Sequence, residues 1–212
     1  MIKKFLIFLL LFFSYANATS WYSKGCINEA LKSFDVEENI DDMPYLEKML
    51  ESYKSSMKTH LDRHEEIRED FEYVKNELQK NNLPVSIAYV CFAESNFQRK
   101  ARGYNTAGIW QLTNSSARIL GLEVSRKVDE RVDVKKSTQA VIKLWKRLLK
   151  KYDKLYLADF AYGIGEGGLD RMIESRDSRS FAKLWKSGRI KYGTKAHFTK
   201  VILLHCAFSA KN

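Results

Sequence analysis

Residues Pro84 to Phe97 read PVSIAYVCFAESNF, an apolar run that contains one acidic side chain, Glu94. The run is typical of a buried helix, and Pro84 suits its first turn because that turn leaves an amide unpaired. A carboxylate in apolar surroundings pays a desolvation penalty, which raises its pKa and favours the protonated form. A protonated carboxyl can act as a general acid, so Glu94 is a candidate catalytic residue. For a lone glutamate at a helix end, exposure to solvent is nevertheless the commoner arrangement.

The rest of the chain shows helical periodicity and no strict alternation of apolar and polar residues, so we expect an all-α fold. Residues 98–113 lack periodicity and predict a loop. The polar, acidic stretch 19–44 is expected to be a loosely attached leader. The expected helical stretches are 44–80, 84–94, 141–148, 155–162 and 194–208.

The first 18 residues have the parts of a secretory signal peptide. Lys3 and Lys4 precede an apolar run from Phe5 to Phe13, and small residues lead to an A-x-A site that ends at Ala18. The apolar run is too short to span a bilayer comfortably. We therefore expect cleavage after Ala18, export to the periplasm, and no stable membrane span.

The formal net charge is +10, and removing Lys3 and Lys4 leaves +8. A basic balance favours an anionic partner such as a cell-wall polymer, although it serves solubility equally well. Export argues against nucleic acid, and no basic run interleaved with aromatic residues resembles a nucleic-acid module.

The chain has three cysteines, which allow one disulfide and one free thiol in an oxidising compartment. Cys91 lies in the apolar run and is expected to be a buried thiol. That leaves Cys26 to pair with Cys206. No spacing of histidines and cysteines indicates a metal site, and we expect no metal or cofactor.

Four segments stand out in order along the chain: AESNF at 93–97, TAGIWQ at 106–111, DERVD at 129–133 and AYGIG at 161–165. Together they resemble the motifs of the soluble lytic transglycosylase (SLT) catalytic domain, a lysozyme-like bacterial family that cleaves peptidoglycan. The second segment is most similar to the membrane-bound D-type branch, which has tryptophan before the glutamine. The D-type enzymes also carry LysM repeats, which we expect to be absent here. The resemblance implies a lysozyme-like helical domain over residues 81–205, preceded by N-terminal helices within 19–80.

The resemblance implies catalysis by Glu94 alone, on peptidoglycan glycan strands and without a cofactor. Glu94 would protonate the oxygen that links N-acetylmuramic acid (MurNAc) to N-acetylglucosamine (GlcNAc). It would then take a proton from the muramic C6 hydroxyl, which closes onto C1 to give a 1,6-anhydro end. Most glycosidases instead use two carboxyl groups. Asp129, Glu130 and Asp133 are not expected to supply the second one, because acids are common at helix starts.

Four further residues are expected to contact the substrate: Ser95, Gln111, Trp110 and Tyr162. Each also has an ordinary structural alternative. The alternatives are that Ser95 ends a helix, that the Gln111 amide bonds to its own loop, that Trp110 is buried, and that Tyr162 is a core residue whose hydroxyl reaches solvent.

Three positions differ from the family pattern. Gly163 stands where the family has asparagine, and with Gly165 it is expected to close a helix. Gly103 falls where a loop serine is often found, and His197 stands where tyrosine is usual. These differences leave two alternative functions open: a muramidase that uses water, and a wall-binding assembly factor that has lost turnover. The sequence does not distinguish cleavage within strands from cleavage at their ends, and it does not identify the cellular process.

Overall fold

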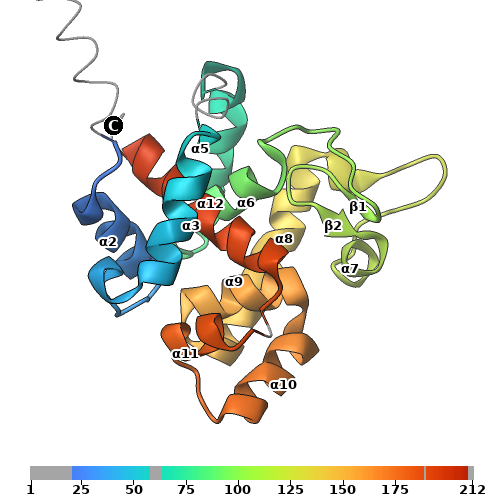
Figure 1. Cartoon of the computed structure of the whole chain (residues 1–212). Coiled ribbons are helices and arrows are strands. Elements are labelled where there is room, and N and C mark those ends of the chain that lie inside the picture. Colours follow the sequence, from blue (N-terminus) through green and yellow to red (C-terminus); the bar gives the residue numbers. More distant parts are fainter. Residues whose placement is uncertain (1–20, 58–63, 189, 210–212) are drawn as a thin grey trace, which may run out of the picture.

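The computed structural model describes residues 21–57, 64–188 and 190–209, so the expected signal peptide lies outside the described residues. The regular secondary structure in these ranges is almost all helix, which confirms the all-α expectation. None of the described helices is both long and apolar enough to cross a bilayer. The helices are α2 Lys24–Ser33, α3 Pro44–Lys54, α5 His64–Lys80, α6 Ile87–Ser95, α7 Asn114–Ile119, α8 Val134–Tyr152, α9 Leu155–Ile164, α10 Glu166–Arg176, α11 Phe181–Lys186 and α12 Tyr192–Ser209 (Figure 1). The short elements are the 3₁₀ turns η1 Ile40–Asp42 and η2 Glu130–Val132, and the antiparallel strands β1 Thr106–Ala107 and β2 Leu112–Thr113.

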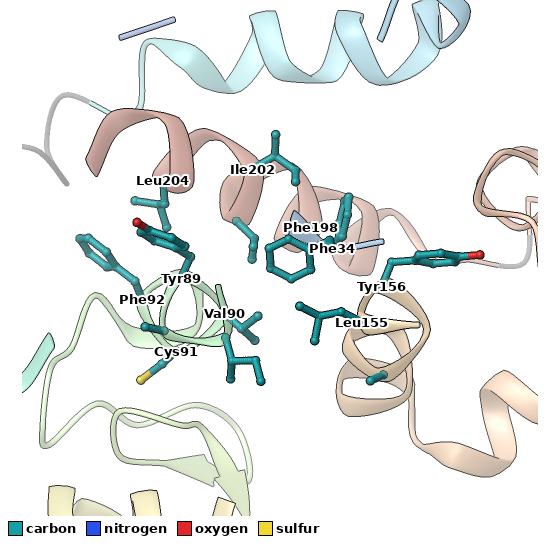
Figure 2. Close-up of a cluster of buried hydrophobic side chains, with 14 of the residues drawn as sticks. Phe34, Tyr89, Val90, Cys91, Phe92, Leu155, Tyr156, Phe198, Ile202 and Leu204 are labelled. Carbon is teal, nitrogen blue, oxygen red and sulfur yellow. The ribbon is translucent and has the colours of Figure 1, made fainter. Parts of the chain in front are cut away.

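Helices α6 and α12 form the centre of the core. Both are apolar around most of their circumference, a pattern that predicts a helix enclosed by others. Figure 1 shows α12 crossing the molecule beside α6, with α2 and α3 nearby. Burying one large apolar side chain contributes about 1.5–3 kcal/mol, so this crossing is a major source of stability. Figure 2 shows side chains that meet there and beside α9: Phe34, Tyr89, Val90, Cys91, Phe92, Leu155, Tyr156, Phe198, Ile202 and Leu204.

The N-terminal region is part of this core from α2 onward. Ile27 and Leu31 of α2 are buried, and the ring of Phe34 packs edge-on against Phe198 at 5.6 Å between centroids. The Asp35 carboxylate accepts a 2.7 Å hydrogen bond from the Leu155 amide at the start of α9. The expectation of a loosely attached leader is therefore wrong for the described part of residues 19–44. The apolar core is continuous across residues 80 and 81, and the division into 19–80 and 81–205 stays a prediction.

Proline and aspartate mark several element starts. Pro44 occupies the first turn of α3, as expected. Pro84 instead lies in a turn before α6, which begins three residues later, and its carbonyl accepts from the Ile87 amide at 3.2 Å. Asp129 caps η2, and Asp133 caps α8 by accepting from the Lys136 amide at 2.9 Å. Both aspartates thus have the helix-start role expected from the sequence.

The structure confirms the expected disulfide between Cys26 and Cys206, with Cα atoms 5.5 Å apart, and Cys91 is a buried free thiol. The bridge joins α2 to α12 across 180 residues of sequence. A crosslink that closes so long a loop strongly restricts the unfolded chain.

Breaking this bridge is expected to lower the free energy of unfolding by about 2–5 kcal/mol, because the unfolded chain regains loop entropy. Urea denaturation of the wild type, with and without reductant, measures the change. Cys26→Ser is the preferred variant because Cys26 is only partly buried, whereas Cys206 is fully buried. Cys26→Ser should match the reduced wild type and should not respond to reductant. Equal urea midpoints for the oxidised and reduced wild type would contradict the expectation.

Candidate active site

Glu94 lies in the last turn of α6, and the chain leaves that turn through two residues with left-handed backbone. Asn96 has φ 54° and caps the helix, its amide donating to the Phe92 carbonyl at 2.8 Å. Phe97 also has φ 54°, a conformation that costs a bulky residue on the order of 1 kcal/mol. Its ring packs at 5.7 Å from those of Phe71 and Phe92, and this packing holds the strained turn. Such strain is often found at functional sites.

The Glu94 side chain is 22% exposed, so it is mostly buried but solvent still reaches it. Burial raises the pKa of this carboxyl above its usual range. The charge of His197 opposes the rise, Asp159 adds to it, and Lys200 opposes it more weakly. Glu94 therefore has two properties that suit a general acid, namely a side chain that solvent reaches and a pKa above that of an ordinary carboxyl.

The loop that precedes β2 is attached to three helices around Glu94. From α6, the Ser95 hydroxyl donates to the Ile109 carbonyl at 2.8 Å. From α9, the Tyr162 hydroxyl donates to the Trp110 carbonyl at 2.5 Å. The Trp110 indole in turn donates to the Thr138 hydroxyl of α8 at 3.0 Å. These three bonds fix the loop beside the end of α6.

This arrangement gives Ser95 and Trp110 structural roles. Both are buried, Trp110 completely. Tyr162 is partly buried and stacks on Trp145 at 5.4 Å. Its hydroxyl binds the loop rather than Glu94, and burial keeps its pKa well above the usual range. For these three residues the structure supports the structural alternative, and substrate contact stays a prediction.

Gln111 is also engaged within its own loop. Its backbone is left-handed, with φ 47°. Its side-chain amide donates to the Gly108 carbonyl at 2.8 Å, and its oxygen accepts from the Thr106 hydroxyl at 2.7 Å. The same hydroxyl fills the space beside Gly103, where an added Cβ would lie 2.3 Å from it. A serine at position 103 would therefore require Thr106 to move, and contact of Gln111 with a sugar stays a prediction.

Arg131 also stabilises this loop. It is buried, and its guanidinium donates to both oxygens of Asp129, each at 2.8 Å, and to the Leu112 carbonyl at 3.1 Å. Hydrogen bonding to Arg131 holds the pKa of Asp129 far below its usual range. A Cβ on Gly108, which has φ 78°, would lie 1.8 Å from the Arg131 carbonyl oxygen, so only glycine fits. Glu130 pairs with Lys136 at 2.5 Å, and the DERVD segment is thus a structural support.

The structure adds two residues to the site that the sequence did not assign to it. His197 of α12 lies with Nδ1 3.7 Å from Oε1 of Glu94 and Nε2 3.7 Å from Oδ1 of Asp159 on α9. The Asp159 side chain is 1% exposed, and neither of its oxygens has a hydrogen-bond partner among the described residues. The signal for Asp159 was a single acid in an apolar helix, which is the same signal that singled out Glu94.

We find no cluster of three His, Cys, Asp or Glu side chains suited to a metal ion in the described part of the chain.

Comparison with known proteins identifies the family of the chain. The sequence model of the transglycosylase SLT domain family matches residues 72–185, just over half of the chain. The chain belongs to the transglycosylase SLT family. The match includes Glu94, the attached loop and Tyr162, but it ends before His197.

The chain is similar to the membrane-bound lytic murein transglycosylase D of Escherichia coli K12, at 32% identity over 134 residues. The match covers 62% of this chain and 30% of that protein, and the enzyme of Escherichia coli O6:H1 gives the same values. A protein of Alteromonas sp. strain M-1, described as "Putative tributyltin chloride resistance protein", is 35% identical over 105 residues. That match covers 49% of this chain and 51% of the relative. The chain thus spans between about a third and a half of the curated relatives it matches.

Gly163 and Gly165 differ in what their backbones require. Gly163 lies inside α9, and an added Cβ would meet only Thr194 Cγ2, at an ordinary 3.9 Å. Gly165 ends the helix with φ 78° and ψ 150°, a region that is essentially restricted to glycine. The expectation that both close the helix therefore holds for Gly165 alone.

We expect Gly163→Asn to keep the free energy of unfolding within about 0.5 kcal/mol of the wild type, because the two residues have similar helix propensities. Gly165→Asn is the matched variant and should lose about 1–3 kcal/mol. Urea denaturation measures both. An equal loss for the two variants would refute the assignment of the helix end.

Proposed function

We propose that this protein is a lytic transglycosylase of the periplasm. In this proposal it cleaves the β-1,4 bond between MurNAc and GlcNAc in peptidoglycan glycan strands and leaves 1,6-anhydro-MurNAc ends. Glu94 acts first as the acid and then as the base. Membership of the SLT family and similarity to a murein transglycosylase support the substrate class.

The observation that carries the proposal is the position of the Glu94 and Asp159 carboxyl groups on either side of His197. The Glu94 side chain is 22% exposed, whereas that of Asp159 is 1% exposed and lies on the far side of the His197 ring. A hydrolase of the usual kind needs a second carboxylate that reaches the sugar or a water molecule. Asp159 does not meet this requirement, and a reaction in which the substrate supplies its own nucleophile fits a single accessible acid.

The reaction follows from the state of Glu94. The protonated carboxyl donates to the glycosidic oxygen, the bond to C1 breaks, and the GlcNAc hydroxyl leaves. The Glu94 carboxylate then accepts the proton of the muramic C6 hydroxyl while that oxygen bonds to C1. The proton on Glu94 is restored, and no water is consumed.

Replacing the proton donor tests the assignment. Glu94→Gln is expected to reduce release of soluble fragments from purified sacculi by at least about 100-fold, because the amide is almost the same shape but cannot donate this proton. Mass spectrometry of the wild-type digest should find anhydro-MurNAc ends. Reducing ends would instead identify a muramidase, and no release by the wild type would favour a wall-binding assembly factor.

Glu130→Gln is the matched control, since Glu130 pairs with Lys136 and accepts from the Glu123 amide at 2.7 Å, away from the proposed chemistry. It should retain wild-type cleavage. Rapid solubilisation by Glu94→Gln would refute the role of Glu94.

The same variant has a stability signature. Because burial raises the folded-state pKa of Glu94, the stabilisation from its protonated form is complete below the unfolded pKa and is lost as pH rises through the folded pKa. The Glu94→Gln variant has no carboxyl to ionise at this position, so it does not lose stability in this way as pH rises. Its thermal midpoint at pH 8 should therefore equal or exceed that of the wild type, which also shows that lost activity is not lost folding. A lower midpoint for Glu94→Gln at pH 8 would contradict the burial argument.

A further inference from the structure

Asp159 needs an explanation because it is a buried carboxylate without a hydrogen-bond partner among the described residues. Leaving such a charge uncompensated costs several kcal/mol, so buried carboxylates are paired or protonated. Among the described residues, His197 supplies a cationic group beside it, with Nε2 3.7 Å from Oδ1 of Asp159. At that distance the two form an ion pair rather than a hydrogen bond.

His197 is held between two acids. Its Nε2 faces Asp159 of α9, and its Nδ1 faces Glu94 of α6. Burial lowers the pKa of His197, but Asp159 and then Glu94 outweigh that effect, and the net direction is upward. Lys200, one turn further along α12, acts weakly in the opposite direction. The geometry and the charges therefore both favour the protonated imidazole.

We propose that His197, kept charged by Asp159, is a positioning residue that stabilises the Glu94 carboxylate formed when Glu94 gives its proton to the leaving group. The proposal rests on the proposed function, since it assigns a partner to the same acid.

The protons balance without any change at His197 or Asp159. Before the reaction the cluster holds neutral Glu94, cationic His197 and anionic Asp159. Donation to the glycosidic oxygen leaves a Glu94 carboxylate 3.7 Å from the imidazolium. The C6 proton then returns Glu94 to its neutral form. The imidazolium thus favours the carboxylate that develops on Glu94, which is where fixed charges contribute most to catalysis.

Two variants give opposite pH signatures. His197→Gln removes a positive charge, so Glu94 should lose its proton at higher pH, and the alkaline limb of the kcat profile should move up. Asp159→Asn removes a negative charge, so the doubly protonated pair of Glu94 and His197 should lose its first proton at lower pH, and the limb should move down. Each variant should also lower kcat by about 10- to 100-fold, which is the rate factor that corresponds to the free energy of one contact with a charged group.

If His197 and Asp159 had purely structural roles, the two variants would not move the alkaline limb in opposite directions. The matched control is His205→Gln. His205 is also on α12, its ring meets that of Tyr89 at 4.9 Å, and burial lowers its pKa. This variant should keep the wild-type pH profile.

The imidazole can be followed without any assay of activity. In a ¹H–¹³C NMR titration, the His197 ring of the wild type should show a raised pKa. That pKa should fall in Asp159→Asn, and also in Glu94→Gln, because each variant removes an acid that favours the cation. An unchanged His197 pKa in Asp159→Asn would overturn the proposal.

The outcomes separate this inference from the proposed function. If Glu94→Gln is inactive while His197→Gln and Asp159→Asn keep the wild-type kcat and alkaline limb, the inference fails alone. If Glu94→Gln remains active, the proposed function fails whatever the titration gives. An inactive Glu94→Gln, opposite shifts of the limb and the expected titrations together support both.

Discussion

The contact between α6 and α12 is the constraint on which the rest of the structure depends. In this contact a second apolar helix, which carries His197, covers an apolar helix that has Glu94 in its last turn. Helix α12 also packs against α2, where Cys206 and Cys26 form the disulfide that joins α2 to the core. Burial of Glu94 is the main cause of its raised pKa. Core packing and the raised pKa therefore share one physical cause, the removal of side chains from water.

Much of this was predictable from local sequence. Helical periodicity predicted an all-α chain, and the acid within PVSIAYVCFAESNF predicted a carboxyl whose pKa burial would raise. The start of α3 at Pro44 and the capping aspartates before η2 and α8 followed from rules that involve only neighbouring residues. Such features need no knowledge of which helices meet.

What was missed depends on contacts between distant segments. Asp159 and His197 meet because α9 and α12 pack together, and neither spacing nor composition reveals that pairing. The leader was misjudged for the same reason, since its polar composition hides the apolar face that α2 turns toward α12. The structural contacts of the motif residues Ser95, Trp110 and Tyr162 also depend on distant segments. These residues attach a loop to three helices, and their expected contact with substrate stays a prediction.

The position of α12 has a consequence for how the protein is assembled. When the chain is synthesised from its N-terminus, all four family motifs are complete at residue 165. His197, which lies beside Glu94, comes 32 residues later, and Cys206, the partner of Cys26, comes later still. The unfinished chain therefore lacks the centre of its core and the charge beside its acid. Folding of the core and formation of the disulfide therefore both depend on α12, which follows all four motifs in the sequence.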